Sequence, residues 1–210
     1  MVTFDLHCRR CVRLATFLDQ VKAAHPSYHA RPVPPFGDPM ARLLVVGLAP
    51  GMHGANASGR PFTGDHAGIL LYRTLYDFGF SDHPESRSAG DGLRLTDCRI
   101  TNAVKCLPPG NKPLGSEVVA CNPYLRAELA GLAPGGLVLA LGTVAHQAVL
   151  KARGLRLADY PFGHAREHPL PGDLRLIDSY HCSRYNTQTR RLTEAMFQAV
   201  LERARQLLDP

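Results

Sequence analysis

The 210-residue chain has no tryptophan, few lysines and no long apolar run. Because no stretch of about 18 consecutive apolar residues occurs, no segment is expected to span a membrane. The first eleven residues, MVTFDLHCRRC, also lack the apolar centre of a secretory signal peptide. These absences predict a cytoplasmic protein that has no membrane partner.

The common phosphate-binding loops are missing as well. The segment GLAPGMHGANASGRPFTGD, residues 47–65, follows an apolar run, and such a glycine-rich loop usually brings backbone close to a ligand. Its glycines do not form G-x-G-x-x-G, and no Gly-Lys-Ser/Thr closes a Walker-type loop. Pro50 also removes one backbone N–H that a phosphate cradle would use. The spacing therefore argues against a nucleotide phosphate as the ligand of this loop.

The charge balance is basic and depends on arginine. The chain has 24 Lys and Arg against 18 Asp and Glu, which gives a formal charge of +6, and only four of the 24 are lysines. Arginine favours bidentate contact with phosphate, so a polyanionic partner is plausible. On charge alone, however, an ordinary solvated surface is the more common explanation.

Four strand-like apolar runs alternate with helix-like segments. Continuous apolar strands of this kind are typical of a parallel sheet that helices cover on both faces, so we expect an α/β fold in which residues 1–210 form a single domain. Residues 25–39 contain five prolines and are expected to be an irregular loop. The expected strands are 42–48, 97–104, 136–141 and 173–179, and the expected helices are 8–24, 66–79, 116–132, 143–153 and 193–208.

Unusual residues follow each expected strand. In parallel sheets, functional side chains gather just beyond the carboxyl ends of the strands. The four loops at those positions are GLAPGMHGAN, TNAVKCLPPGNKP, LGTVAHQ and SYHCSRYN. Their coincidence predicts an active site at this edge of the sheet.

Four of the six cysteines have the spacing of a metal site. Cys8 and Cys11 form a C-x-x-C pair, and Cys106 and Cys121 bracket fourteen residues beside a strand-end loop. Disulfides are not expected in a cytosolic chain. Four thiolates brought together would hold zinc or an iron–sulfur cluster, and buried free thiols are the plain alternative. The remaining two cysteines, Cys98 and Cys182, have no partner at close spacing.

Three loops taken in order, GLAPGMHGANASGRPFTGD, ITNAVKCLPPGNKP and SYHCSRYNTQTRRLT, resemble uracil-DNA glycosylases, and with the four cysteines they most resemble the iron–sulfur family 5, or B-type, group. The resemblance implies a three-layer αβα sandwich around a four-stranded parallel sheet. It also implies a structural 4Fe–4S cluster, with zinc as the alternative, that ties the N-terminal helix to the rest of the chain. The implied reaction is hydrolysis of the N-glycosidic bond of a base flipped out of DNA.

A flipped uracil needs a stacking ring and hydrogen bonds to its Watson–Crick edge. Phe62 matches the stacking aromatic of the family, although it could also be a core residue. Asn102 offers a donor and an acceptor for the uracil edge, or could simply cap loop backbone. The backbone N–H groups of residues 47–51 could supply further donors. The expected base-binding residues are Gly47, Ala49, Pro50, Gly51, His53, Phe62 and Asn102, with Asn56 facing the same loop.

Catalysis requires donors for the departing base and a group that orients water. His181 resembles the motif histidine that binds uracil O2. Many superfamily members carry an acid where this chain has Leu48, and this departure moves the expected acidic role to Asp65. Asp65 has a competing role as the N-cap of the next helix. Asn111 resembles a second polar residue of the group, and we expect it to hold the water.

The last loop is expected to contact DNA. Its His181-Cys182-Ser183 replaces the common His-Pro-Ser, and the loss of proline predicts a looser loop. The expected DNA contacts are Arg184, Tyr185, Asn186, Arg190, Arg191 and Lys112.

No lysine is placed as a Schiff-base nucleophile, so we expect base release without strand cleavage. The expected partner is DNA that contains uracil or other deaminated bases such as hypoxanthine, and the chain is expected to act as a monomer. Two alternatives stay open: a non-catalytic binder of damaged or single-stranded DNA, and a metal-stabilised nucleotide hydrolase.

Overall fold

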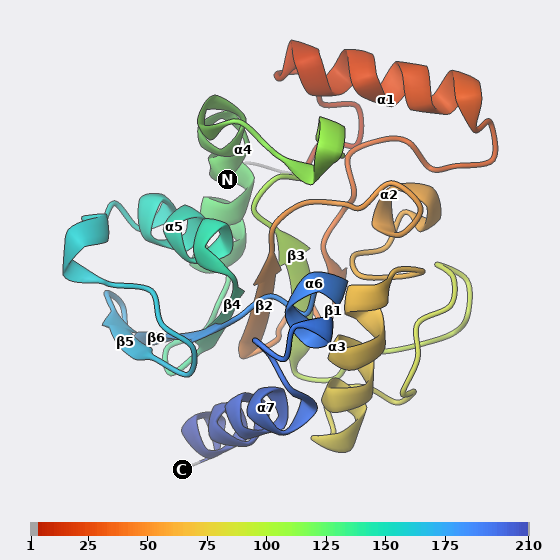
Figure 1. The fold of residues 1–210 in the computed structure, drawn as a ribbon. Helices are drawn as coiled ribbons and strands as arrows, with labels where there is room; N and C mark the ends of the chain where they lie inside the picture. Colours follow the sequence, from red (N-terminus) through yellow and green to blue (C-terminus); the bar gives the residue numbers. More distant parts are fainter. Residues whose placement is uncertain (1–3, 210) are drawn as a thin grey trace.

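A mixed six-stranded sheet forms the centre of the computed structural model, which describes residues 4–209 (Figure 1). The strand order is β1-β3-β2-β4-β6-β5. The inner four strands pair in parallel, and β1 and β5 pair antiparallel at the two edges. The strands are β1 Phe36–Gly37, β2 Leu43–Gly47, β3 Cys98–Asn102, β4 Leu137–Leu141, β5 Glu167–Leu170 and β6 Leu174–Ser179.

The expected four-stranded parallel sheet is therefore corrected to a six-stranded mixed sheet. The four strands expected from the sequence are its inner strands. The edge strands give no continuous apolar run: β1 has two residues and lies in the proline-rich segment, and β5 contains Pro169. Proline is tolerated at a sheet edge, where its missing N–H breaks no inner ladder bond.

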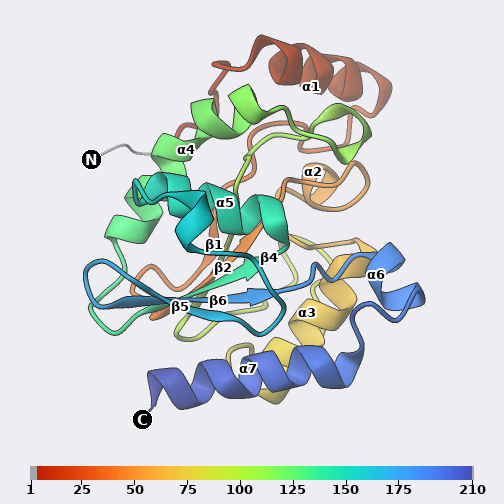
Figure 2. The ribbon, with the colours of Figure 1, turned by 60° about the vertical axis from the view of Figure 1, so that its left-hand side comes forward.

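Helices cover both faces of the sheet (Figure 2). Alternate residues of β2 point to opposite faces: Leu43 and Val45 pack with α3 and α7, whereas Leu44 and Val46 pack with α4 and α5. The helices are α1 Val12–Ala24, α2 Ala55–Ser58, α3 His66–Asp77, α4 Gly115–Ala130, α5 Thr143–Ala152, α6 Arg184–Gln188 and α7 Glu194–Leu208, with short 3-10 turns at Pro109–Asn111 and Leu157–Asp159.

Helix α1 lies outside α4, as the outermost layer on that face (Figure 2). The sequence predicted that this helix begins at Cys8, but it begins at Val12. Cys8 instead closes a turn, in which its N–H donates to the Asp5 carbonyl. Arg13 of α1 forms a 2.8 Å ion pair with Glu117 of α4, and this guanidinium holds the pKa of the Glu117 carboxyl below its usual range. This ion pair keeps Cys8 and Cys11, which precede α1, close to α4.

The parallel register brings the carboxyl ends of the inner strands to one edge of the sheet. Gly47, the last residue of β2, pairs directly with Asn102, the last residue of β3. Strand β6 ends at Ser179 and leads into the segment that carries His181. Within residues 4–209, none of the helices combines the length and apolar character needed to span a bilayer.

Candidate active site

A cavity of about 440 Å³ lies at the carboxyl ends of these strands. Its wall includes Leu48 and Ala49 after β2, Asn102 at the end of β3 and His181 after β6. Parallel sheets place ligand sites at this position. Of the residues predicted from the sequence, those that line the cavity are Ala49, Gly51, Phe62, Asp65, Asn102, Asn111, His181 and Arg184.

Gly47 lies directly against two residues that line the cavity, Phe62 and Asn102. A Cβ atom at this position would lie 2.5 Å from Cζ of Phe62 and 2.5 Å from Oδ1 of Asn102. Both distances are far below van der Waals contact, so only glycine lets the ring and the amide approach the end of β2.

Phe62 belongs to the core and to the cavity wall. Its side chain is 5% exposed and packs in the core cluster, and its ring also stacks on His181 with centroids 5.9 Å apart and planes at 30°. Its backbone has a φ of 55°, an uncommon conformation for a bulky residue. Phe62 is therefore a core residue, as its alternative role predicted, and its ring also lines the cavity.

Asn102 carries an unsatisfied polar group beside the cavity. The residue is 3% exposed, and its Nδ2 has no hydrogen-bond partner within the described chain. Leaving a buried donor unpaired costs about 1–3 kcal/mol. Asn102 thus brings an unpaired amide donor close to the wall of the cavity.

His181 is held by its own loop. Burial lowers the pKa of its imidazole to about 4, so the ring is neutral near neutral pH and can donate one hydrogen bond. Asn186 Nδ2 donates to the His181 carbonyl at 2.8 Å, Cys182 is fully buried in the core, and Ser183 caps α6. These anchors hold the loop despite the missing motif proline.

Asp65 is the N-cap of α3, as its alternative role predicted. Its Oδ1 accepts a hydrogen bond from the Gly68 N–H at 2.9 Å. Its Oδ2 faces the turn at Gly51 and Gly54, and a Cβ at Gly54 would lie 2.7 Å from it. Burial raises the pKa of this carboxyl. Asp65 therefore caps the helix with one oxygen and faces the cavity region with the other.

Three predicted base-binding residues, Gly47, Pro50 and His53, are not among the residues that line the cavity, and His66, which lines it, was not predicted. His53 is exposed, and its Nδ1 is 2.8 Å from the Tyr28 hydroxyl. Pro50 is buried behind the wall. His66 lines the cavity, with Nε2 3.0 Å from Thr187 Oγ1. Its position directly after Asp65 was the signal that could have identified it. Asn56 is fully buried and does not line the cavity.

The predicted DNA-binding residues surround the cavity on two sides. Arg184 lines the rim, and Tyr185 is 70% exposed. Arg190 lines a neighbouring surface groove that shares His66 with the cavity. Exposed Asn111 also lines the cavity, at the end of the Pro109–Asn111 turn, and exposed Lys112 follows it in the chain. The Asn186 side chain, by contrast, is bonded inward to the His181 carbonyl.

A second, smaller cavity of about 20 Å³ is lined by Cys8, Cys11, Cys106 and Cys121. Burial raises the pKa of Cys121 to about 11. It raises the pKa of Cys106 further, and the nearby thiols also raise the pKa of Cys106. The Lys105 N–H donates to Cys121 Sγ at 3.3 Å. The donor set is all sulfur, and it joins the N-terminal segment to the segment after β3 and to α4.

Residues 34–205 match the family model of the Uracil DNA glycosylase superfamily, and the chain belongs to this superfamily. It is 48% identical over 205 residues to the "Type-5 uracil-DNA glycosylase" of Thermus thermophilus, covering 95% of this chain and 93% of that protein. The protein with the same description from Pyrobaculum aerophilum is 42% identical over 203 residues, covering 95% and 88%. A "Type-4 uracil-DNA glycosylase" of Pyrobaculum aerophilum is 36% identical over 130 residues, covering 61% of this chain and 58% of that protein. The family resemblance predicted from the loops is confirmed.

Proposed function

We propose that this chain is a monofunctional DNA glycosylase that flips uracil out of DNA and hydrolyses its N-glycosidic bond, the first step of base excision repair. Other deaminated bases, such as hypoxanthine, are further substrates in this proposal. The observation that carries it is the meeting of the unpaired Asn102 amide with the Phe62–His181 ring pair in one cavity. The type-5 descriptions of the relatives at 42–48% identity support the same activity.

The base is recognised before the bond breaks. The uracil ring stacks on Phe62, as flipped bases do on aromatic side chains. Asn102 Nδ2 donates to O4, and its Oδ1 accepts from N3–H. Because Gly47 has no side chain, both residues can contact the same base.

Bond breaking places negative charge on the uracil and positive charge on the sugar. Neutral His181 donates to O2, and backbone N–H groups of Ala49 and Gly51 add donors where the negative charge develops. Asp65 uses the oxygen that does not cap α3 to orient water or to stabilise the sugar cation. Asn111 holds the water from the rim.

The product is an abasic site in an intact strand. No lysine lies among the described residues that line the cavity. Lys105, the buried lysine of the β3–α4 segment, is paired with Glu128 Oε1 at 2.8 Å. Among the described residues that line the cavity, none therefore offers a primary amine that could form a Schiff base with the sugar.

The four-cysteine cavity fits a 4Fe–4S cluster better than zinc. In a tetrahedral zinc–thiolate site the sulfurs lie about 3.8 Å apart, because each Zn–S bond is about 2.3 Å. Among the described residues, these four sulfurs do not form a close group of metal-ligand atoms. A cluster accepts this wider spacing, and the Lys105 N–H is the kind of donor that stabilises cluster-bound sulfur. When bound, the group supplies a cross-link between the N-terminal segment and α4.

The DNA path follows the exposed basic residues beside the cavity. Arg184 and Tyr185 act as the wedge that enters the duplex, and Lys112, Arg190 and Arg191 neutralise phosphates. The formal charge of +6 favours this partner. Affinity for DNA should fall as salt rises, because bound phosphates release counterions.

The test is uracil release from a double-stranded oligonucleotide with one G·U pair, using protein purified without oxidant. Strand cleavage that requires mild alkali supports the proposal, and cleavage without alkali contradicts the monofunctional mechanism. DNA binding without release would favour a non-catalytic binder, for which the presence of Leu48 instead of an acid is the supporting feature.

A further inference from the structure

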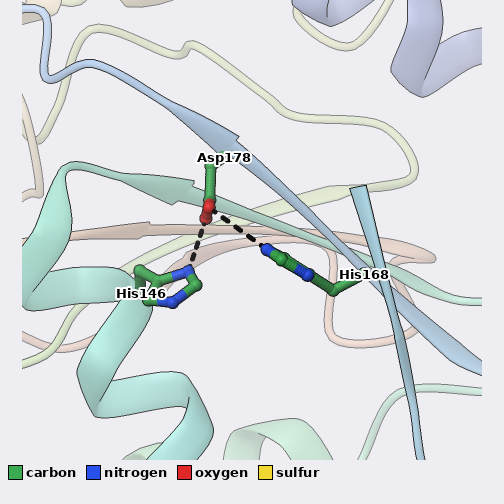
Figure 3. Close-up of side chains that lie close together, drawn as sticks. All are labelled: His146, His168 and Asp178. Atoms are coloured by element: carbon green, nitrogen blue, oxygen red, sulfur yellow. Dashed lines mark hydrogen bonds and ion pairs between the residues drawn. The ribbon is translucent and has the colours of Figure 1, made fainter. Parts of the chain in front are cut away.

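Three buried ligand-type side chains meet between α5, β5 and β6, away from both cavities described above. His146 comes from α5, His168 from β5 and Asp178 from β6 (Figure 3). Their side chains are 2%, 9% and 0% exposed. One ligand atom from each lies within 4.8 Å of the other two.

The hydrogen bonds of His146 fix the direction of its lone pair. Its Nε2 is 2.8 Å from the carbonyl of Tyr160, and a carbonyl only accepts, so Nε2 carries a hydrogen. In the neutral ring, Nδ1 then has a lone pair that points at Asp178 Oδ1, 2.8 Å away. Histidines that bind metals characteristically anchor the other ring nitrogen in this way.

His168 is the unsatisfied member of the group. Its Nε2 is buried, has no hydrogen-bond partner within the described chain, and lies 3.7 Å from Asp178 Oδ2. This distance is too long for a hydrogen bond.

Two imidazole nitrogens and a carboxylate that face one point form a donor set that suits a metal cation. A single proton between His146 and Asp178 satisfies that pair and leaves His168 Nε2 unpaired. A divalent ion about 2.0–2.2 Å from each ligand atom satisfies all three groups after small shifts. Two nitrogens and one oxygen suit Zn²⁺ better than the hard cations Ca²⁺ and Mg²⁺.

We propose that His146, His168 and Asp178 form a structural zinc site. The ion would join edge strand β5, inner strand β6 and helix α5. Strand β6 continues from Asp178 toward His181, and the Gly142 N–H just before α5 donates to the Ser179 carbonyl at 2.8 Å. The site thus stabilises the strand that leads into the candidate catalytic loop.

The experiment measures zinc and iron per chain by mass spectrometry after incubation of the whole protein with Zn²⁺ and removal of loosely bound metal. About one zinc per chain is expected in the wild type, and His168→Ala and Asp178→Asn should lose it. Cys106→Ser should lose iron and keep this zinc, which separates the two sites. The matched control is His83→Ala, because His83 and Asp82 form an exposed pair at 2.9 Å without a third ligand.

If these variants fail to fold, a measurement of Tm on the wild type still tests the proposal. Removal of zinc from the wild type by a chelator should lower Tm by about 5–10 °C, and added Zn²⁺ should restore it. A wild type that retains no zinc and has the same Tm with or without chelator would overturn the proposal and leave a proton-bridged pair. Zinc retained by His168→Ala but lost by Cys106→Ser would overturn it too. Both readouts are independent of uracil release.

Discussion

Gly47 and Asn102 end two neighbouring parallel strands as a directly paired couple, and a Cβ on Gly47 would lie 2.5 Å from the Asn102 amide oxygen. The same Cβ would strike the Phe62 ring. The positions of Phe62 and Asn102 therefore both depend on the absence of a side chain at Gly47.

Gly47→Ala should lower the single-turnover rate of uracil release by about 100-fold or more, because displacement of positioned groups by about 1 Å has effects of this size. Gly115→Ala is the control, since a Cβ there meets nothing within 4 Å. An unchanged rate in Gly47→Ala would show that Phe62 and Asn102 do not need their present positions.

Asp65→Asn separates the helix cap from the carboxylate, because asparagine caps helices as well as aspartate does. We expect stability near that of the wild type and release slowed by about 100-fold. Asp65→Ala should slow release similarly and also lose about 1 kcal/mol of unfolding free energy in urea titrations. Thr193→Ala, which removes the N-cap of α7, should lose comparable stability without slower release. A wild-type rate in Asp65→Asn would restrict Asp65 to its capping role.

The pH dependence of uracil release and of stability should show that the His181 ring is neutral. Its pKa of about 4 in the folded chain lies below the ordinary value of about 6.5. As the pH falls, His181 therefore binds a proton in the unfolded chain before it does so in the folded chain. Its contribution to the free energy of unfolding is complete above pH 6.5 and is lost as the pH falls toward 4. Release by the wild type should show no step near pH 6.5. Histidine NMR, assigned by comparison with His181→Asn, checks the pKa directly, and titration of His181 near 6.5 would contradict the donor role of the neutral ring.

Asn102→Asp should change which base is accepted. A carboxylate cannot donate to uracil O4 but can accept from the amino group of cytosine. Uracil release should fall by about 10–100-fold, and the ratio of cytosine to uracil release should rise. Asn122→Asp is the matched control, because buried Asn122 donates to the Ala148 carbonyl far from the cavity. Unaltered base preference in Asn102→Asp would reduce Asn102 to a structural residue.

Cys106→Ser should remove the iron and loosen the N-terminal segment. Iron content and visible absorbance should fall, and α1 should become sensitive to protease before the sheet does. Cys98→Ala, at a cysteine buried in the core on the other face of the sheet, should keep its iron. Full iron content in Cys106→Ser would contradict the proposed ligand set.

The sequence predicted the elements with strong periodicity, namely the inner strands and the longer helices. It missed β1 and β5 because edge strands need no continuous apolar run, and β5 contains Pro169. It started α1 too early, since C-x-x-C gives no helix start signal and the cap at Cys11 makes no side-chain hydrogen bond.

Candidate residues at or near a strand end were the easiest to place at the cavity from the sequence. Asn102 and His181 follow directly from strands, so their place at the cavity is set by the sheet. The direction of His53 depends on a turn and its contact with Tyr28, which no local pattern reveals. The group around Asp178 was invisible because it requires the pairing of β5 with β6 and the packing of α5 against them.

The placement of β2 has a consequence for local opening. It has β3 on one side and β4 on the other, so its backbone groups are bonded on both flanks, whereas the short strands β1 and β5 occupy the exposed edges. Fraying starts at edges, where fewer bonds must break. Either margin of the sheet can therefore open without moving Gly47, and the amides of β2 should be among the last to exchange with solvent.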